Sequence, residues 1–445
     1  MDSHELNAAG HFAKKRKDPY AFSRAMYIIE ALVEYLITLT ISGAYLAKIT
    51  EAIGMEDSLT GIVTAFLSLG HLFQLIALLL TGVKRVKPMI TVSFIVNQTF
   101  FALLYIIPLI SIGKATQTVL FIAMILGGYI ITNIISPCRT SWMMSFVDTR
   151  GRGVFTAKKE IISLIGGMIY SVLIGNVITY FEERGQLKTA FIICAITIFV
   201  FMIMHTATLI LTKEKLSDHD EHIAVPKQAK QRVDILGVLK DKRLLAVMAV
   251  YIMWYIANYI STPFYGTYQN KELGFTLAFV SIISVASSIS RAVLSIPVGR
   301  FADKYSFTKM LSLVFAIAAV GFIVCGFATP SNGKVVFTIY SILHAVAMAG
   351  INSGSINLIY EHYKGDNKTG ALAVSHACSG LCGFLTTLAA SKLVASIQEN
   401  GNKFLGLELY AQQVVSFIAA AIVIIIIIYL NTVITNLNKR KDIEE

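Results

Sequence analysis

Long apolar segments, separated by short polar ones, are the feature that most constrains how this chain can fold. Each segment is close in length to the about 20 helical residues that cross the hydrocarbon core of a bilayer. Hydrophobic residues make up 55% of the sequence and charged residues only 15%, against about 25% charged in an average soluble domain. A soluble enzyme, a disordered chain and a secreted disulfide-bonded scaffold are therefore excluded.

Twelve segments are long and apolar enough to span a membrane. We expect helices because a segment in lipid must satisfy its backbone hydrogen bonds internally, and these continuous runs lack the alternation of barrel strands. The predicted spans are 22–47, 58–82, 88–111, 117–138, 159–181, 189–212, 244–268, 275–297, 309–329, 334–359, 370–396 and 409–435.

The positive charges predict the orientation of these spans. Lysines and arginines gather in the two tails and in every second loop, as with Lys84, Arg85 and Lys87 between the second and third spans. Cytoplasmic loops carry such an excess, so both termini are expected in the cytoplasm. The net charge of +11 is interpreted as loop charge, and no nucleic-acid partner is expected. The charged start of the chain does not resemble a signal peptide, so the first span is expected to remain in the mature protein.

A polar stretch divides the spans into six and six. The predicted domains are a cytoplasmic tail (1–21), a six-helix bundle (22–212), a cytoplasmic linker (213–243), a second six-helix bundle (244–435) and a cytoplasmic tail (436–445). The predicted fold class is thus an all-α membrane protein. Twelve spans form a complete pathway, so a monomer in the lipid bilayer is expected.

The loop after the eighth span carries a recognisable motif. Gly299, Asp303 and Lys304 match the pattern G-x-x-x-D-[R/K]-x-G-[R/K]-[R/K] of the major facilitator superfamily, while Ser306 replaces the second glycine. The first-half copy, from Gly82 to Pro88, has the bases but no aspartate. With its six-plus-six topology, the chain resembles this superfamily over nearly its whole length.

The resemblance implies a mechanism in which two helical bundles rock around a site near the membrane midplane. It also implies that Gly299, Asp303 and Lys304 form a cytoplasmic gate. Physically, Asp303 is placed to cap the following helix and to pair with bases on neighbouring loops. The alternative is an ordinary positively charged loop with one acid.

Two carboxylates share one face of the first span. Glu30 and Glu34 are four residues apart, and ionisable groups within a span need a compensating function or partner. We expect this face to meet a polar cavity, with Glu34 as a proton carrier and Glu30 held by a cation. Structural pairing with arginines and direct substrate binding remain open alternatives.

Two arginines are the natural counterparts of these acids. Arg139 ends the fourth span and is the expected partner of Glu30, with snorkelling to the interface as the alternative. Arg291 lies in the eighth span on a stripe with Ser281, Ser284 and Ser288. It is expected to bind an anionic substrate group or to reach Glu30 or Glu34 across the bundles.

Polar aromatic residues mark a face of the seventh span. Tyr251, Tyr255 and Asn258 recur at helical spacing, and rings with polar tips suit a ligand cavity. Tyr265 on the same face suits interfacial anchoring better. The further polar candidates for substrate binding are His71, Gln74, Asn133, His344 and Asn352.

The sequence predicts a secondary active transporter in the plasma membrane, moving a small polar or amphipathic solute and coupled to protons. A multidrug or metabolite exporter is the alternative, and a membrane receptor or membrane-embedded enzyme is a distant one. No metal or organic cofactor is expected, because the five cysteines form no C-x-x-C pair and no phosphate-binding loop or catalytic motif occurs.

Overall fold

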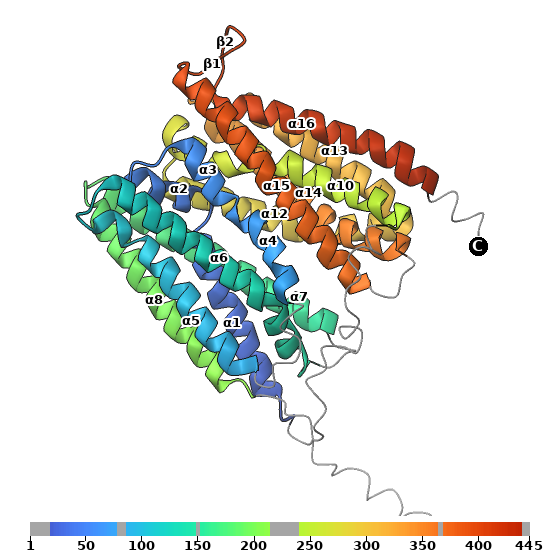
Figure 1. Ribbon diagram of the computed structural model, residues 1–445, viewed down its shortest axis with the longest axis horizontal. Helices are drawn as coiled ribbons and strands as arrows, with labels where there is room; N and C mark the ends of the chain where they lie inside the picture. The colour runs from blue at the N-terminus through green and yellow to red at the C-terminus, as the bar shows by residue number, and fades with distance from the viewer. Residues whose placement is uncertain (1–17, 78–85, 148–151, 214–239, 364–367, 438–445) are drawn as a thin grey trace, which may run out of the picture.

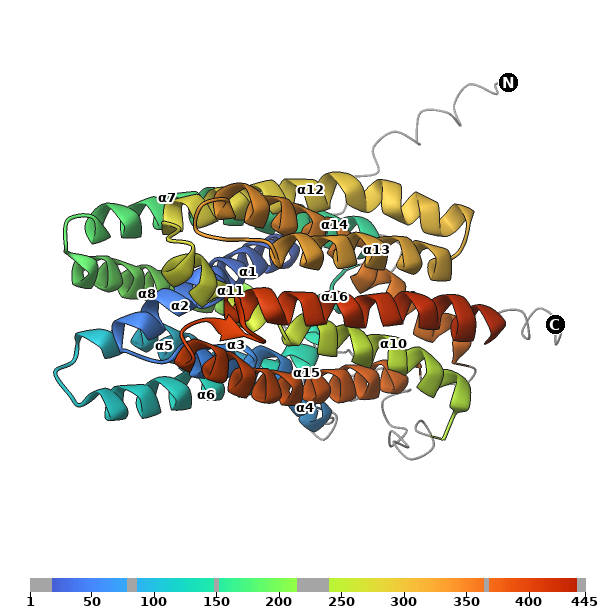
Figure 2. The same ribbon diagram turned by 90° about the horizontal axis from the view of Figure 1, so that it is seen from above.

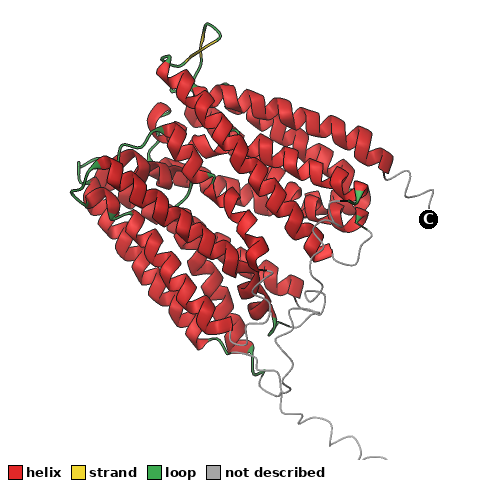
Figure 3. Ribbon diagram, viewed as in Figure 1, coloured by secondary structure: helices red, strands yellow, loops and turns green. Residues whose placement is uncertain are grey.

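The computed structural model describes residues 18–77, 86–147, 152–213, 240–363 and 368–437. Within these ranges the chain is helical apart from loops and one short hairpin of β1 (Lys403–Phe404) and β2 (Leu407–Glu408) (Figure 3). Most of the predicted linker and tails, and most of the first-half motif at 82–88, lie outside the described residues.

The helices of the first half form one bundle (Figure 1). They are α1 (Ala21–Thr40), α2 (Gly43–Ala52), α3 (Asp57–Thr64), α4 (Phe66–Ala77), α5 (Val86–Leu104), the 3-10 turn η2 (Ile107–Leu109), α6 (Lys114–Met144), α7 (Arg152–Glu182) and α8 (Leu187–Leu211).

The helices of the second half form the other bundle. They are α10 (Lys242–Tyr259), η5 (Thr262–Phe264), α11 (Tyr265–Thr267), η6 (Tyr268–Glu272), α12 (Leu277–Lys304), α13 (Phe307–Cys325), α14 (Gly333–His362), α15 (Lys368–Glu399), α16 (Ala411–Tyr429) and η7 (Leu430–Ile434).

The described residues contain eleven helices long and apolar enough to cross a membrane. The pair α1 and α2, bent by 47°, gives a twelfth span when counted together, which is the predicted number. The bend falls where Ser42 leaves the helix and Gly43 adopts a φ of +54°, a conformation that suits glycine. The all-helical class is confirmed, and each predicted span overlaps an observed helix.

The two bundles meet chiefly through two pairs of helices. α4 packs against α15, and α7 packs against α12 (Figures 1 and 2). At the first contact Ser68 Oγ donates a hydrogen bond to the backbone oxygen of Gly380 at 2.8 Å. At the second, Tyr45 OH and Ser281 Oγ lie 2.8 Å apart, and Ser281 Oγ donates to the backbone oxygen of Ser171 at 2.7 Å.

The bundles are joined at one end and splayed at the other. α2 and α3 contact η5, α11 and η6 at the joined end, which lies at the upper left of Figure 1. There Asp57 accepts hydrogen bonds from Lys271 Nζ at 2.5 Å and from Gln398 Nε2 at 2.9 Å. α1 begins and η7 ends at the splayed end (Figure 1).

Candidate functional site

A cavity of about 500 Å³ lies between the two bundles. Its walls come from α1, α2 and α7 on one side and from η6, α12 and α14 on the other. The lining is rich in hydroxyl groups, and its polar side chains include Tyr35, Ser42, Ser171, Gln269, Ser284, Ser287, Ser288, Arg291, Ser341 and His344. A volume of this size is within the range of about 300–1,000 Å³ typical of small-molecule sites.

Arg291 is the one lysine, arginine, aspartate or glutamate that lines this cavity within the described part of the chain. No described carboxylate lies within ion-pairing distance of its guanidinium group. The predicted alternative of a bridge from Arg291 to Glu30 or Glu34 is therefore wrong for this state, because both carboxylates are held elsewhere. Ser284 and Ser288 line the cavity beside it, whereas Ser281 is buried against Tyr45.

A second, smaller cavity of about 250 Å³ adjoins the first. Its lining is Tyr251, Trp254, Tyr255, Asn258, Tyr259, Met348, Ile351, Asn352 and His376. The rings of Tyr255 and Tyr259 are stacked with centroids 5.5 Å apart. The structure thus brings the predicted Tyr251, Tyr255, Asn258 and Asn352 into one aromatic recess.

The two cavities share a thin wall. Met348 lines both, and His344 Nε2, on the side of the larger cavity, lies 3.0 Å from Asn258 Oδ1 on the side of the smaller. His71 lies near the recess on α4, where its Nδ1 is 3.5 Å from Tyr255 OH. His71 therefore sits at the contact between bundles and does not line either cavity.

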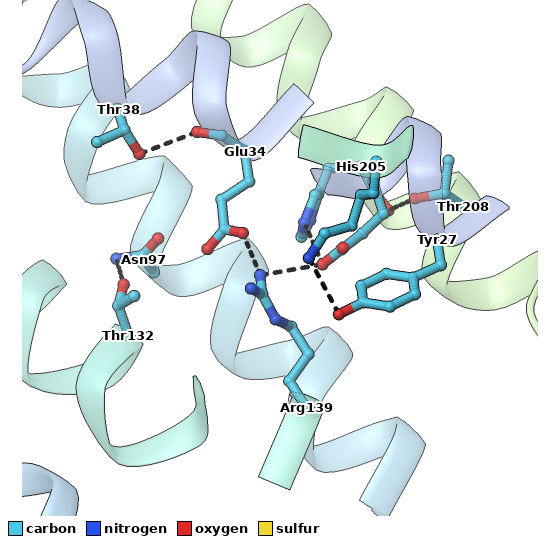
Figure 4. Close-up of polar contacts among 10 residues, drawn as sticks. Tyr27, Glu34, Thr38, Asn97, Thr132, Arg139, His205 and Thr208 are labelled. Atoms are coloured by element: carbon cyan, nitrogen blue, oxygen red, sulfur yellow. Dashed lines mark hydrogen bonds and ion pairs between the residues drawn. The ribbon is translucent and has the colours of Figure 1, made fainter. Parts of the chain in front are cut away.

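A buried ionic cluster lies within the first bundle (Figure 4). Arg139 Nη1 is 3.1 Å from Glu30 Oε1 and also contacts Glu34 Oε2. His205 Nε2 lies 3.1 Å from Glu30 Oε1, and the side chains of Glu30 and His205 are fully buried. The guanidinium group of Arg139 is 5.2 Å from the ring centroid of Phe94. One arginine thus serves two carboxylates.

His205 was missed in the sequence analysis. It is the one histidine in α8, a mostly apolar helix whose only other lysine, arginine, histidine, aspartate or glutamate is Lys188 in the first turn. That isolation was the available signal, because a polar ring in such a helix needs a buried partner.

Glu34 lines a cavity of about 120 Å³ inside the first bundle. Thr38, Asn97, Gln98, Thr132 and Asn133 are among its lining residues. Gln74 Nε2 donates to Asn133 Oδ1 at 3.0 Å. Asn133 and Gln74, both predicted to bind substrate, line neither of the two larger cavities, and Asn133 lines this smaller one instead.

The gate motif lies at the splayed end of α12. Gly299, Asp303 and Lys304 are exposed, and in the described residues Asp303 forms no ion pair. The expectation that Asp303 caps the next helix is wrong: Ser306 caps α13, accepting a hydrogen bond from the backbone nitrogen of Lys309 at 3.2 Å. Ser306 stands immediately before the helix, where a side-chain oxygen reaches the third residue of the helix.

Two bundles of apolar helices around a polar cavity define a membrane transporter. The sequence profile of the Major Facilitator Superfamily matches residues 26–276 and 244–443. The chain therefore belongs to the major facilitator superfamily, a family of multi-pass membrane transporters of small solutes and not of enzymes. No curated protein matches the sequence.

Solved structures share this fold at low sequence identity. The nucleoside transporter NupG is 13% identical, with a TM-score of 0.65 over 92% of this chain and 98% of that one. The D-xylose-proton symporter is 15% identical, with a TM-score of 0.61 over 91% and 97%. A bacterial homologue of the iron transporter ferroportin in an inward-facing state is 13% identical, with a TM-score of 0.64 over 92% and 98%.

Proposed function

We propose that this chain is a monomeric secondary active transporter of the plasma membrane, which moves a small polar or amphipathic solute by alternating access. The observation that carries the proposal is the hydroxyl-lined cavity of about 500 Å³ between two bundles that are tied together at the Asp57 end. With the termini in the cytoplasm, the splayed end faces the cytoplasm and the Asp57 end faces outward. The inward-facing state of the ferroportin homologue is in keeping with this orientation.

We further propose that protons drive transport through Glu34. Arg139 contacts two carboxylates, so the three groups carry one negative charge in excess when all are ionised. Of the two acids, Glu30 has a fully buried side chain, while the Glu34 side chain is 23% exposed and lines the 120 Å³ cavity. A proton on Glu34 removes the excess charge and frees Arg139 to pair with Glu30 alone. His205 also lies at this cluster, and so does Lys159, whose Nζ is 3.3 Å from Tyr27 OH.

The test is solute uptake by proteoliposomes with and without an inward proton gradient. Wild-type protein should accumulate solute only with the gradient. Glu34→Gln should exchange solute across the membrane at equal concentrations but no longer accumulate it. Accumulation by Glu34→Gln as strong as that of the wild type would rule out Glu34 as the carrier.

An exporter is the second candidate function. A multidrug exporter needs a broad apolar cavity, and the serines and Arg291 that line this one favour a polar solute instead. The same liposomes, assayed with the gradient reversed, separate import from export.

A further inference from the structure

The two adjoining cavities differ in chemistry in a way that constrains the solute. The larger contains the cationic Arg291 and no described acid, and its Ser287 hydroxyl has no hydrogen-bond partner among the described residues. The smaller is lined largely by aromatic rings, and no lysine, arginine, aspartate or glutamate is among its lining residues. One side thus offers a cation with hydroxyl groups, and the other offers flat apolar faces.

The charge of the larger cavity favours an anion. An unpaired guanidinium group in a partly dehydrated cavity gains most from a carboxylate or phosphate, which it can bind through two parallel hydrogen bonds. Cations are disfavoured, because no described carboxylate lines the cavity to hold them. The field around Arg291 therefore selects for negative charge.

The size and walls of the smaller cavity favour a ring. At about 250 Å³ it lies below the range of about 300–1,000 Å³ for complete small-molecule sites, so it suits a part of a solute. The stacked Tyr255 and Tyr259 and the indole ring of Trp254 offer flat faces to an aromatic ring or to the apolar face of a sugar. Asn258 adds a polar group at its edge.

The two cavities have one lining residue in common. Met348 borders both, and the His344–Asn258 hydrogen bond of 3.0 Å completes the partition. Methionine is flexible and rearranges at low cost. We expect a rotamer change of Met348, together with opening of the His344–Asn258 hydrogen bond, to join the two cavities.

We infer that the solute is an organic anion that carries a ring, with its acidic group at Arg291 and its ring in the recess beside Tyr255. This inference rests on the proposed transport function, and it names the solute class. Aromatic acids and sugar acids share the required chemistry, so the experiment compares the two.

The experiment measures binding to the purified full-length chain by thermal shift and calorimetry. The probes are benzoate and D-glucuronate, with benzyl alcohol and D-glucose as their neutral counterparts and acetate as an anion without a ring. At least one ring acid should bind about tenfold or more tightly than both its neutral counterpart and acetate, the factor that one charge-assisted hydrogen bond supplies.

Three variants divide this preference into its parts. Arg291→Gln should abolish the preference for the acid over its neutral counterpart. Tyr255→Leu should abolish the preference for the ring acid over acetate. Arg184→Gln is the matched control and should bind like the wild type. Arg184 is exposed just after the end of α7, where its side chain bonds to the backbone and lies over the Tyr180 ring.

Three outcomes would overturn the inference. They are equal binding of the acid and its neutral counterpart, an unchanged preference for the acid in Arg291→Gln, and no binding of either ring acid at millimolar concentration. Counterflow in proteoliposomes separates this failure from failure of the proposed function. Exchange of a neutral sugar or an amino acid would leave the transport proposal standing without the anionic solute. A ring acid that binds but does not exchange would support the anionic ligand and contradict the transport proposal.

Discussion

Lys271 Nζ lies 2.5 Å from Asp57 Oδ1, and this ion pair joins the two bundles at their closed end. The Asp57 side chain is 4% exposed and also accepts a hydrogen bond from Gln398, so a single carboxylate ties α3 to both η6 and α15. Separation of the bundles at this end must break both bonds. Under the proposed alternating access, Asp57 is the point at which a substitution should change the balance between the two open states.

Asp57→Asn should shift the protein toward the state that is open at this end. Removing one charge of a largely buried, hydrogen-bonded pair costs about 2–5 kcal/mol. A cysteine introduced at Ser42, which lines the large cavity, should react faster with an impermeant thiol reagent added from the Asp57 side. Glu182→Gln is the control, since Glu182 pairs with Lys48 within the first bundle. Equal labelling rates in Asp57→Asn and Glu182→Gln would show that the pair does not hold the bundles together.

Gly380→Ala should loosen the contact between α4 and α15. A Cβ atom added at Gly380 would lie 2.5 Å from the backbone oxygen of Ser68, and a backbone atom cannot move aside as a side chain can. Overpacking of this kind typically lowers the free energy of unfolding by about 1–3 kcal/mol, so the variant should unfold at a lower temperature in detergent. Gly113→Ala, where an added Cβ meets nothing within 4 Å, is the control. Matching melting temperatures for the two variants would show that this contact is not tight in solution.

Arg139→Gln should destabilise the first bundle strongly. It leaves the buried Glu30 and the nearby Glu34 without their cation, and breaking a buried pair in this way costs about 3–5 kcal/mol. The double variant Arg139→Gln with Glu30→Gln should recover part of the loss, because it removes the sealed carboxylate as well. Thermal unfolding in detergent measures both. A double variant no more stable than the single one would mean that Arg139 acts through packing, for instance against Phe94.

Ser306→Ala should weaken the first turn of α13. The loss of a helix cap costs about 0.5–2 kcal/mol. Hydrogen exchange at the start of α13 should therefore become faster, while exchange in α12 stays the same. Ser312→Ala is the control, since Ser312 is partly exposed further along α13 and its hydroxyl makes only a long bond of 3.4 Å to Asn431. If the Ser306 variant exchanges like the Ser312 variant, the cap contributes nothing measurable.

The sequence was sufficient for the number of spans and for some of the polar positions. Apolar length alone marks a span, and the spacing of Glu30 and Glu34 places both on one face of α1. The spacing of Tyr251, Tyr255 and Asn258 likewise follows from helical periodicity, and the three line one recess.

The other features depend on contacts between helices, which periodicity does not specify. His205 meets Glu30 only because α8 packs beside α1. Asn133 and Gln74 are as polar as the cavity residues, yet the rotation of α6 and α4 turns them toward each other. The division of the cavity by Met348 and His344 requires α14 to lie against α10. Ser306 caps α13 in place of Asp303 because Ser306 is the residue immediately before that helix.

α12 is a single helix of 28 residues, and near its start Ser281 bonds to Tyr45 and to Ser171. At a rise of 1.5 Å per residue, Asp303 lies about 33 Å from Ser281. Because α12 also packs along α14, a tilt of the second bundle about Ser281 would move the whole helix. A tilt of about 10° at Ser281 would carry Asp303 about 6 Å, by the same helical rise. A small rearrangement around the hydroxyl groups of Tyr45 and Ser281 would therefore displace Asp303 by more than the diameter of a water molecule.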